Sequence, residues 1–278
     1  MGSASAQIAL GIDCDRHRYI AYEKINLTLT IRNDSGNTLE FATDDLLQVT
    51  VVDEAGELAG KLRNPGAILK ELKLPSGATR SISFVLNTYY AMQNESDYEV
   101  YVQVGHPRLR SDFRSNRLLI EVRSGTVAWT RTFGLPALKP NSEITSRQAT
   151  LLRFQEKEGE IYCLRIEDRD SVYSVSRLAR RIIGSEPEGE IDALGNIHIL
   201  LRIKARLFLY HVYTYNGELK QEKLYAIDET QPSLYRDPDL GKVAVIGGRP
   251  ALRGVDYVLP GDSAPPTLEG VSPVLEPL

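Results

Sequence analysis

Two histidines in the second half of the chain carry the clearest suggestion of metal chemistry. If Lys204-Ala205 forms a two-residue turn, the flanking strands place His198 opposite His211. Two imidazoles on neighbouring strands can hold Zn²⁺ or Cu²⁺, but a metal site needs a third or fourth ligand, and the sequence does not place one. Lys-Ala is also poor turn chemistry, so two packed or partly exposed histidines are the favoured interpretation.

Acidic residues suggest a second metal hypothesis further along. Asp237 and Asp239 alternate ahead of Gly241, as in a short Ca²⁺ loop that gathers oxygen ligands around a tight turn. The third ligand position and the distal glutamate of such a loop are missing, so an ordinary turn is favoured. A solvated loop is likewise favoured for the acidic run of Glu186, Glu188, Glu190 and Asp192. We therefore expect no cofactor, with Ca²⁺ or Zn²⁺ as the alternatives.

A group of arginines surrounds Phe113 in the segment between two expected strands of the first half. Sandwich domains often present binding residues in such loops, and guanidinium groups bind carboxylates and phosphates. A solvated loop explains the same composition and is favoured. The candidate anion-binding residues are Arg108, Arg110, Arg114 and Arg117.

Enzyme signatures are absent from the sequence. It has no Gly-x-Ser-x-Gly elbow, phosphate loop, dinucleotide glycine motif or His-Glu-x-x-His. The chain has 4 histidines and 2 cysteines, and we expect Cys14 and Cys163 to be two buried thiols. We predict a non-catalytic protein, although a hydrolase built on two carboxylates stays an alternative, because such residues can meet from any distance in sequence.

Charge and hydropathy limit the classes of partner that the sequence predicts. With 33 basic and 37 acidic residues, well mixed along the chain, nothing predicts binding to nucleic acid or to an anionic membrane. No stretch approaches the roughly 20 apolar residues of a transmembrane helix. Met1 to Ser5 resemble a short expression leader, so we assume a removed signal peptide and expect a periplasmic, cell-surface or secreted protein.

Strands must position all of these residues, and the first 125 residues show their period-two pattern repeatedly. In residues 24–32, Ile25, Leu27, Leu29 and Ile31 share one face, and polar residues share the other. Turn signals rich in Asn, Asp, Ser and Gly separate six or seven such runs. This spacing predicts a β-sandwich.

The segment from Tyr19 to Asn33 resembles the second strand of bacterial immunoglobulin-like modules, and Asp97 to Val102 resembles their penultimate strand. The resemblance covers residues 6–124. It implies an immunoglobulin-like sandwich, which we place at 6–134, and it implies no particular function.

The second half suggests repeated strands. Gly159, Gly195 and Gly241 each precede a polar residue and then apolar residues, at intervals close to the ~40 to 45 residues of a propeller blade. We expect a connection at 134–142, an antiparallel meander or propeller-blade-like domain at 143–258, and a proline-rich tail at 259–278. The region resembles a β-propeller but holds only about two and a half blades, so other copies of the chain could cover its edges. Residues 172–182 fit either a strand or a short amphipathic helix.

The leading functional hypothesis is a non-catalytic extracytoplasmic or cell-surface structural or adhesion protein, which acts through protein–protein contacts and self-association. The alternatives are an enzyme or accessory module of glycan or peptide processing, and an inhibitor-like binding module. A glycan partner is suggested by tyrosines concentrated in the second half, although strand packing is the favoured explanation for them. These tyrosines are Tyr210, Tyr213, Tyr215, Tyr225 and Tyr235.

Overall fold

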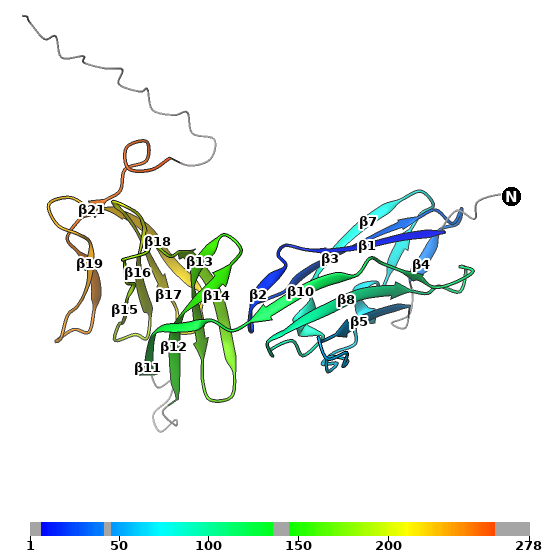
Figure 1. The fold of residues 1–278 in the computed structure, drawn as a ribbon, viewed down its shortest axis with the longest axis horizontal. Coiled ribbons are helices and arrows are strands. Elements are labelled where there is room, and N and C mark those ends of the chain that lie inside the picture. The colour runs from blue at the N-terminus through cyan, green and yellow to red at the C-terminus, as the bar shows by residue number, and fades with distance from the viewer. Residues whose placement is uncertain (1–6, 42–45, 136–144, 259–278) are drawn as a thin grey trace, which may run out of the picture. The chain divides into compact units, whose positions relative to one another are not determined.

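The fold is nearly all β, as the period-two pattern predicts (Figure 1). The structure is a computed structural model, and it describes residues 7–41, 46–135 and 145–258. The expected tail at 259–278 and the expected leader Met1 to Ser5 lie outside the described residues, as does most of the expected connection at 134–142. Within the described part, no helix has the length and apolar character needed to cross a membrane.

The chain divides into two compact units. The first comprises Met1–Val127, Leu152–Arg165 and Ser174–Arg177, and the second comprises Ala128–Leu151, Ile166–Tyr173 and Leu178–Leu278. Strands from the middle of the chain contribute residues to both units. The units therefore do not correspond to a single cut in the sequence.

Two sheets form a sandwich in the first unit. One has the order β1 (Ile8–Cys14), β3 (Asn26–Asn33), β7 (Thr79–Val85). The other has the order β2 (Arg18–Ile20), β10 (Leu118–Arg123), β8 (Ser96–Val104), β5 (Leu47–Val52), with β9 (Phe113–Arg114) paired to β8. Only β2 and β10 run parallel among these pairs. A small ladder joins β4 (Leu39–Phe41) to β6 (Leu72–Leu74), and two short 3₁₀ helices are η1 (Pro65–Ile68) and η2 (Leu86–Thr88).

Alternation along the strands produces the sandwich core. Leu27, Leu29 and Ile31 are fully buried on the inner face of β3, which confirms the predicted pattern. On the outer face Thr28 and Thr30 donate or accept hydroxyl hydrogen bonds with Ser83 and Ser81 of β7. Residues from both sheets share one hydrophobic core, so the sheets pack face to face as a β-sandwich.

Three further sheets follow. The first is β11 (Thr126–Gly134), β12 (Ser146–Glu156), β13 (Gly159–Glu167) and β14 (Val172–Arg180), in sequential order. The second is β15 (Glu188–Ile191), β16 (Ile197–Lys204), β17 (Leu207–Tyr213) and β18 (Leu219–Ala226), with β21 (Arg249–Pro250) at its end. β19 (Ser233–Arg236) and β20 (Val243–Ile246) form a hairpin. The first two sheets are antiparallel meanders, and no closed propeller is present among the described residues.

Two sequence expectations change here. The helical alternative for 172–182 is wrong, because residues 172–180 form β14, and Val175 of this strand packs against a core that contains Phe154 and Cys163. The glycine pattern does not mark equivalent positions: Gly159 opens the third strand of one sheet, Gly195 precedes the second strand of the next, and Gly241 precedes a strand of the hairpin. The interval between these glycines therefore does not measure a structural repeat.

Candidate functional site

The predicted pairing of His198 with His211 is wrong by one residue. β16 and β17 place His198 opposite Val212, and His211 opposite Ile199, so the two imidazoles lie on opposite faces of the sheet. There are two causes: the turn is Ala205-Arg206, because Lys204 pairs with Leu207, and the register then shifts between Arg202 and Lys204. Among the described residues, no group of three or more His, Cys, Asp or Glu side chains is arranged to hold a metal ion.

Each buried histidine has its own polar partners. His198 lies 2.6 Å from the Tyr210 hydroxyl through Nδ1 and 3.2 Å from a carboxylate oxygen of Asp192 through Nε2. His211 lies 2.8 Å from Glu222 through Nε2, and its Nδ1 is 3.4 Å from the Tyr213 hydroxyl. Burial lowers the pKa of His198, and burial raises the pKa of Tyr210 to about 12. The favoured interpretation of two packed histidines fits this geometry.

The acidic candidates occupy turns and ion pairs. An Asp237 carboxylate oxygen accepts hydrogen bonds from the backbone N–H groups of Asp239 and Leu240, at 2.9 and 2.8 Å, in the turn between β19 and β20. Gly241 closes this turn at a φ of +61°, a conformation that glycine adopts readily. The Asp237 side chain thus caps a hairpin turn.

The four candidate arginines do not converge on one point. Arg108 donates to the Thr38 carbonyl oxygen at 2.9 Å, and the Arg110 backbone N–H donates to Gln7. Arg114 lies over the Tyr101 ring at 4.4 Å from its centre, and Arg117 donates to Glu99 at 2.9 Å. Arg117 also lies over the Tyr101 ring, at 5.9 Å from its centre, so two of the four arginines are neighbours while Arg108 contacts a different part of the sandwich.

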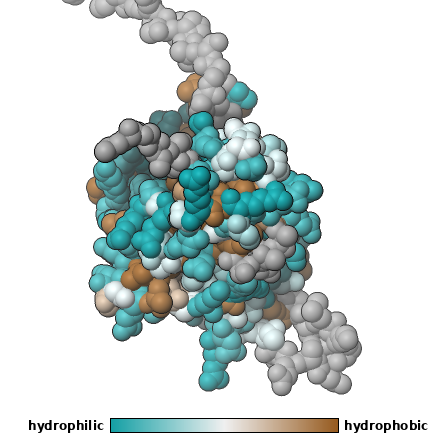
Figure 2. Space-filling model, turned by 90° about the vertical axis from the view of Figure 1, so that its right-hand side faces the viewer, coloured by the Kyte–Doolittle hydropathy of each residue, from teal (hydrophilic) through white to brown (hydrophobic). Residues whose placement is uncertain are grey.

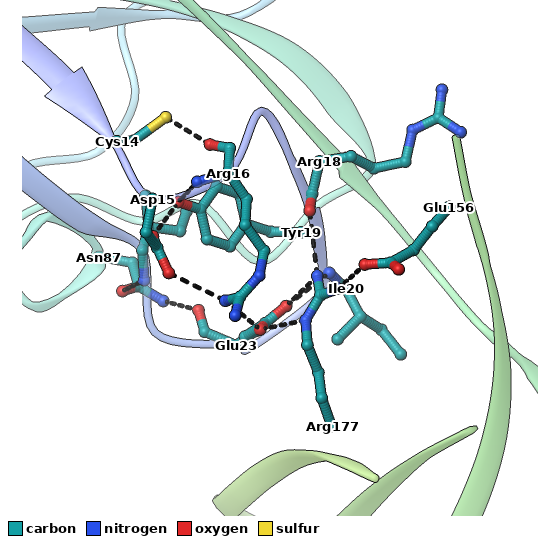
Figure 3. A network of polar contacts seen from close by, with 11 residues as sticks. Cys14, Asp15, Arg16, Arg18, Tyr19, Ile20, Glu23, Asn87, Glu156 and Arg177 are labelled. Carbon is teal, nitrogen blue, oxygen red and sulfur yellow. Dashed lines mark hydrogen bonds and ion pairs between the residues drawn. The ribbon is translucent and has the colours of Figure 1, made fainter. Parts of the chain in front are cut away.

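The largest polar network of the sandwich unit caps an edge strand instead (Figure 3). In the β2–β10 ladder, the backbone groups of Arg18 and Ile20 point away from β10. The Ile20 N–H donates to the Glu23 carboxylate at 3.2 Å, and the Arg18 carbonyl oxygen accepts from Arg177 at 3.0 Å. Side chains therefore satisfy the groups that β2 would otherwise offer to another strand.

Glu23 and Arg177 hold this cap together. Nε and Nη2 of Arg177 donate to the two carboxylate oxygens of Glu23 at 2.6 and 2.9 Å, and Arg177 also binds Glu156. Asn87 donates to the Glu23 carbonyl oxygen at 2.7 Å, and Arg16 lies 3.5 Å from the Glu23 carboxylate. With both carboxylate oxygens bound, this arrangement offers no free general base.

A shallow groove of about 460 Å³ lies beside the network. Basic and acidic side chains line it together, among them Arg18, Glu121 and Lys157, and Arg18 donates to Glu121 at 2.7 Å. Mixed charge gives the groove no preference for an anion or a cation. Cys163 is buried as expected, but Cys14 is only partly buried, and burial raises the pKa of both thiols, which disfavours the reactive thiolate.

Two further edges of the sandwich are also capped. On β1, the Asn116 side chain accepts from the Ile12 N–H at 2.8 Å and donates to the Ile12 carbonyl oxygen at 3.0 Å. On β5, the Val49 carbonyl oxygen accepts from the Tyr90 hydroxyl at 2.6 Å, and Ala59 donates to Val51 at 2.9 Å. A neighbouring strand would have to displace these groups.

Within the described part of the chain, the outer edge of β7 has its one cap at the last residue of the strand, which leaves a longer uncapped run before it. The Asn33 N–H donates to the Ala78 carbonyl oxygen, and the Leu86 N–H donates to the Ile25 carbonyl oxygen, one bond at each end of the β3–β7 ladder. In an antiparallel ladder the backbone groups of alternate residues face the partner strand, so these two bonds show which residues of β7 face β3. The backbone groups of Thr79, Ser81 and Ser83 therefore point away from β3. Among the described residues, no strand pairs with this edge, and the one cap on it is the Thr88 hydroxyl, which donates to the Val85 carbonyl oxygen at 2.7 Å.

The side chains of β7 leave this edge accessible. Thr79, Arg80, Ser81 and Ser83 are exposed, and the inward residues Ile82 and Phe84 are only partly buried although they pack against the core. Arg80 is the one charged residue of the strand. We call the outward backbone groups of Thr79–Val85 with these side chains the β7 edge, and it is our candidate functional site.

No broad apolar face competes with this edge in the view of Figure 2. The surface there is mostly hydrophilic, and hydrophobic residues form small groups. Scattered apolar residues are normal on a protein surface, whereas binding faces usually hold a larger patch.

Comparison with known proteins adds little. No family model matches the chain, and no curated protein is similar to it. Among solved structures, the chain is similar to Spo0M, a sporulation control protein from Bacillus subtilis, at 8% identity and a TM-score of 0.28, over 63% of this chain and 91% of that one. A likeness this remote carries no argument about function.

Proposed function

We propose that this chain is a non-catalytic protein-binding module that recruits an extended protein segment to the β7 edge. The observation that carries the proposal is the run of outward backbone groups at Thr79, Ser81 and Ser83, which no paired strand and no side-chain cap covers among the described residues. The setting we propose is extracytoplasmic or at the cell surface, where such modules serve structural or adhesive roles. This setting rests on the resemblance of the first half to bacterial immunoglobulin-like modules.

Strand addition supplies both affinity and selectivity. A segment beside β7 would exchange main-chain hydrogen bonds with Thr79, Ser81 and Ser83, and these bonds depend little on the partner's sequence. Its alternate side chains would lie beside Ile82 and Phe84 on the core side, which favours apolar residues at every second position. We therefore expect a partner segment with alternating apolar and small polar residues.

A photo-crosslinking amino acid in the full chain tests the proposal in the cells that express it. At position 83 it should capture a specific protein, whereas at Ala9, an exposed residue of the capped strand β1, it should not. Adding Ser81→Pro should abolish the capture, because proline removes the outward N–H while the β3 ladder keeps its bonds. Ser81→Ala is the matched control and should retain it.

The proposal would be contradicted if the same cross-linked proteins formed from positions 83 and 9, or if cross-linking from position 83 survived Ser81→Pro. Circular dichroism of each variant establishes that the sandwich is folded. The proposed setting is tested separately, by fractionating cells that carry the native gene; recovery only from the cytoplasm would overturn it.

A further inference from the structure

We infer that the segment received by the β7 edge is β7 of a second copy of the chain, running antiparallel with Ile82 opposite Ile82. The inference rests on the proposed function and names the partner of that same site. It predicts a continuous six-stranded sheet in the order β1-β3-β7-β7-β3-β1 across the two copies, since β1-β3-β7 is the order within one. The two-fold axis would pass beside Ile82.

Backbone geometry selects this register. Thr79, Ser81, Ser83 and Val85 carry the outward groups, so only registers that match outward residues with outward residues form a ladder. With Ile82 at the centre, Ser81 of each copy exchanges both backbone bonds with Ser83 of the other, and Thr79 lies opposite Val85. This register pairs all 7 residues of the strand. A shift of two residues in either direction leaves part of it unpaired.

Side chains agree with the same register. On the core side, Ile82 of one copy meets Ile82 of the other at a close, non-hydrogen-bonded position. The contact would cover both Ile82 side chains, each of which is partly exposed in a single chain. Arg80 lies opposite Phe84, where its guanidinium can stack on the ring, and the two Arg80 side chains stay apart. On the outer side, Ser81 opposite Ser83 continues the hydroxyl pairs that these serines already make with Thr30 and Thr28.

The contact is small, which determines how it must be measured. One pair of short edge strands buries less than the ~1,200 Å² of a stable interface, so a weak dimer is expected. Sedimentation equilibrium of the full chain, from about 10 to about 500 µM, covers this range of affinity. The average mass should rise from the 31.0 kDa of one chain toward twice that value.

Ser83→Pro should weaken this self-association at least about tenfold, because each copy loses one outward N–H donor of the ladder, two in the dimer. Ser83→Ala keeps the backbone groups and should associate like the native chain. A native chain that stays at 31.0 kDa throughout, or a proline variant that dimerises normally, would overturn the inference.

Cysteine substitutions test the register directly. Ile82→Cys should form a disulfide-linked dimer under mild oxidation, because opposed non-hydrogen-bonded residues lie about 4.5 Å apart between Cα atoms. Thr79→Cys alone should not, since the two positions would be separated along the ladder. A mixture of Thr79→Cys and Val85→Cys chains should give the mixed dimer, which tests the register even if Ile82→Cys fails to fold. The native chain is the control for Cys14 and Cys163, which are free.

The two proposals can fail separately. A monomeric chain that still captures a different protein at position 83, in a manner sensitive to Ser81→Pro, would overturn the second copy as partner and leave the β7 edge as the binding site. Cross-linking of Thr79→Cys to itself would overturn the register. Capture that ignores the proline substitution would overturn both.

Discussion

Replacing Arg177 with methionine should destabilise the sandwich unit by about 3 kcal/mol, at the lower end of the cost of breaking a buried ion pair. The Arg177 side chain is 16% exposed and that of Glu23 is 8% exposed, so solvent screens the pair little. Arg177 provides bonds of 2.6 and 2.9 Å to the two carboxylate oxygens. After its removal, the Glu23 carboxylate would keep only the Ile20 N–H at 3.2 Å and the more distant Arg16. The remaining partners explain why we expect the lower end.

Urea unfolding followed by far-ultraviolet circular dichroism measures this loss, and labelling of Cys163 reports on the same unit. Cys163 is fully buried, so a thiol reagent reaches it only after opening. Arg117→Met is the matched control, because Arg117 and Glu99 are 62% and 40% exposed and such a pair contributes below about 1 kcal/mol. In the double variant Glu23→Gln with Arg177→Met, the two losses should not add, with a coupling of about 1 to 3 kcal/mol. Equal losses for Arg177→Met and Arg117→Met would refute the reasoning.

Two further predictions concern the second unit. Lowering the pH from about 7.5 to about 5.5 should reduce the stability of this unit. Burial lowers the pKa of His198, so the unfolded chain binds the proton at a higher pH than the folded chain does. The stability therefore falls as the pH passes below the ordinary histidine pKa of about 6.5. Urea midpoints at both pH values should fall less for His198→Gln, and an equal fall in both proteins would assign the effect to other groups. Gly189→Ala should cost roughly 1 to 3 kcal/mol and change the fluorescence of Trp129, because the added Cβ would lie 2.8 Å from the indole ring. Gly60→Ala, whose nearest neighbour would be at 3.7 Å, should change neither stability nor fluorescence.

Local pattern predicted the strands well, because burial on one face requires alternation whatever the partner strand is. Leu27, Leu29 and Ile31 are buried as the alternation requires, and the expected all-β class is confirmed. The same pattern was ambiguous at 172–182, where Val172 and Val175 fit a helix as well as a strand. Packing of Val175 against residues far away in sequence decides for the strand, and a local pattern cannot contain that information.

The register between paired strands was harder to predict than the strands themselves. The predicted facing of His198 and His211 assumed a regular two-residue turn at Lys204-Ala205. In the structure Lys204 pairs with Leu207, so the turn is one residue further along the chain. The register then shifts by one residue between Lys204 and Arg202. Because side chains alternate between faces, this single shift separates the two imidazoles completely.

The caps that define the candidate site could not be predicted from the sequence at all. Asn116 reaches Ile12 across a separation of 104 residues, and Arg177 reaches Glu23 across 154. Neither residue belongs to a motif, and each contact exists only after two sheets have assembled. The low charge of β7 was visible in the sequence, but its meaning depends on knowing that the other edges are capped.

Charge distinguishes β7 from β18, an outer strand of the second meander. β18 pairs with β21 only at Tyr225 and Ala226, and the rest of its length carries Lys220, Glu222 and Lys223. Charged residues, above all lysine, are how sheets commonly prevent pairing at an exposed edge. β7 has a single charged residue, Arg80, whose backbone groups face β3 and leave the outer groups unguarded. Uncapped backbone groups at Thr79, Ser81 and Ser83, on a strand with one charged residue, are the features expected if pairing at β7 is retained for function.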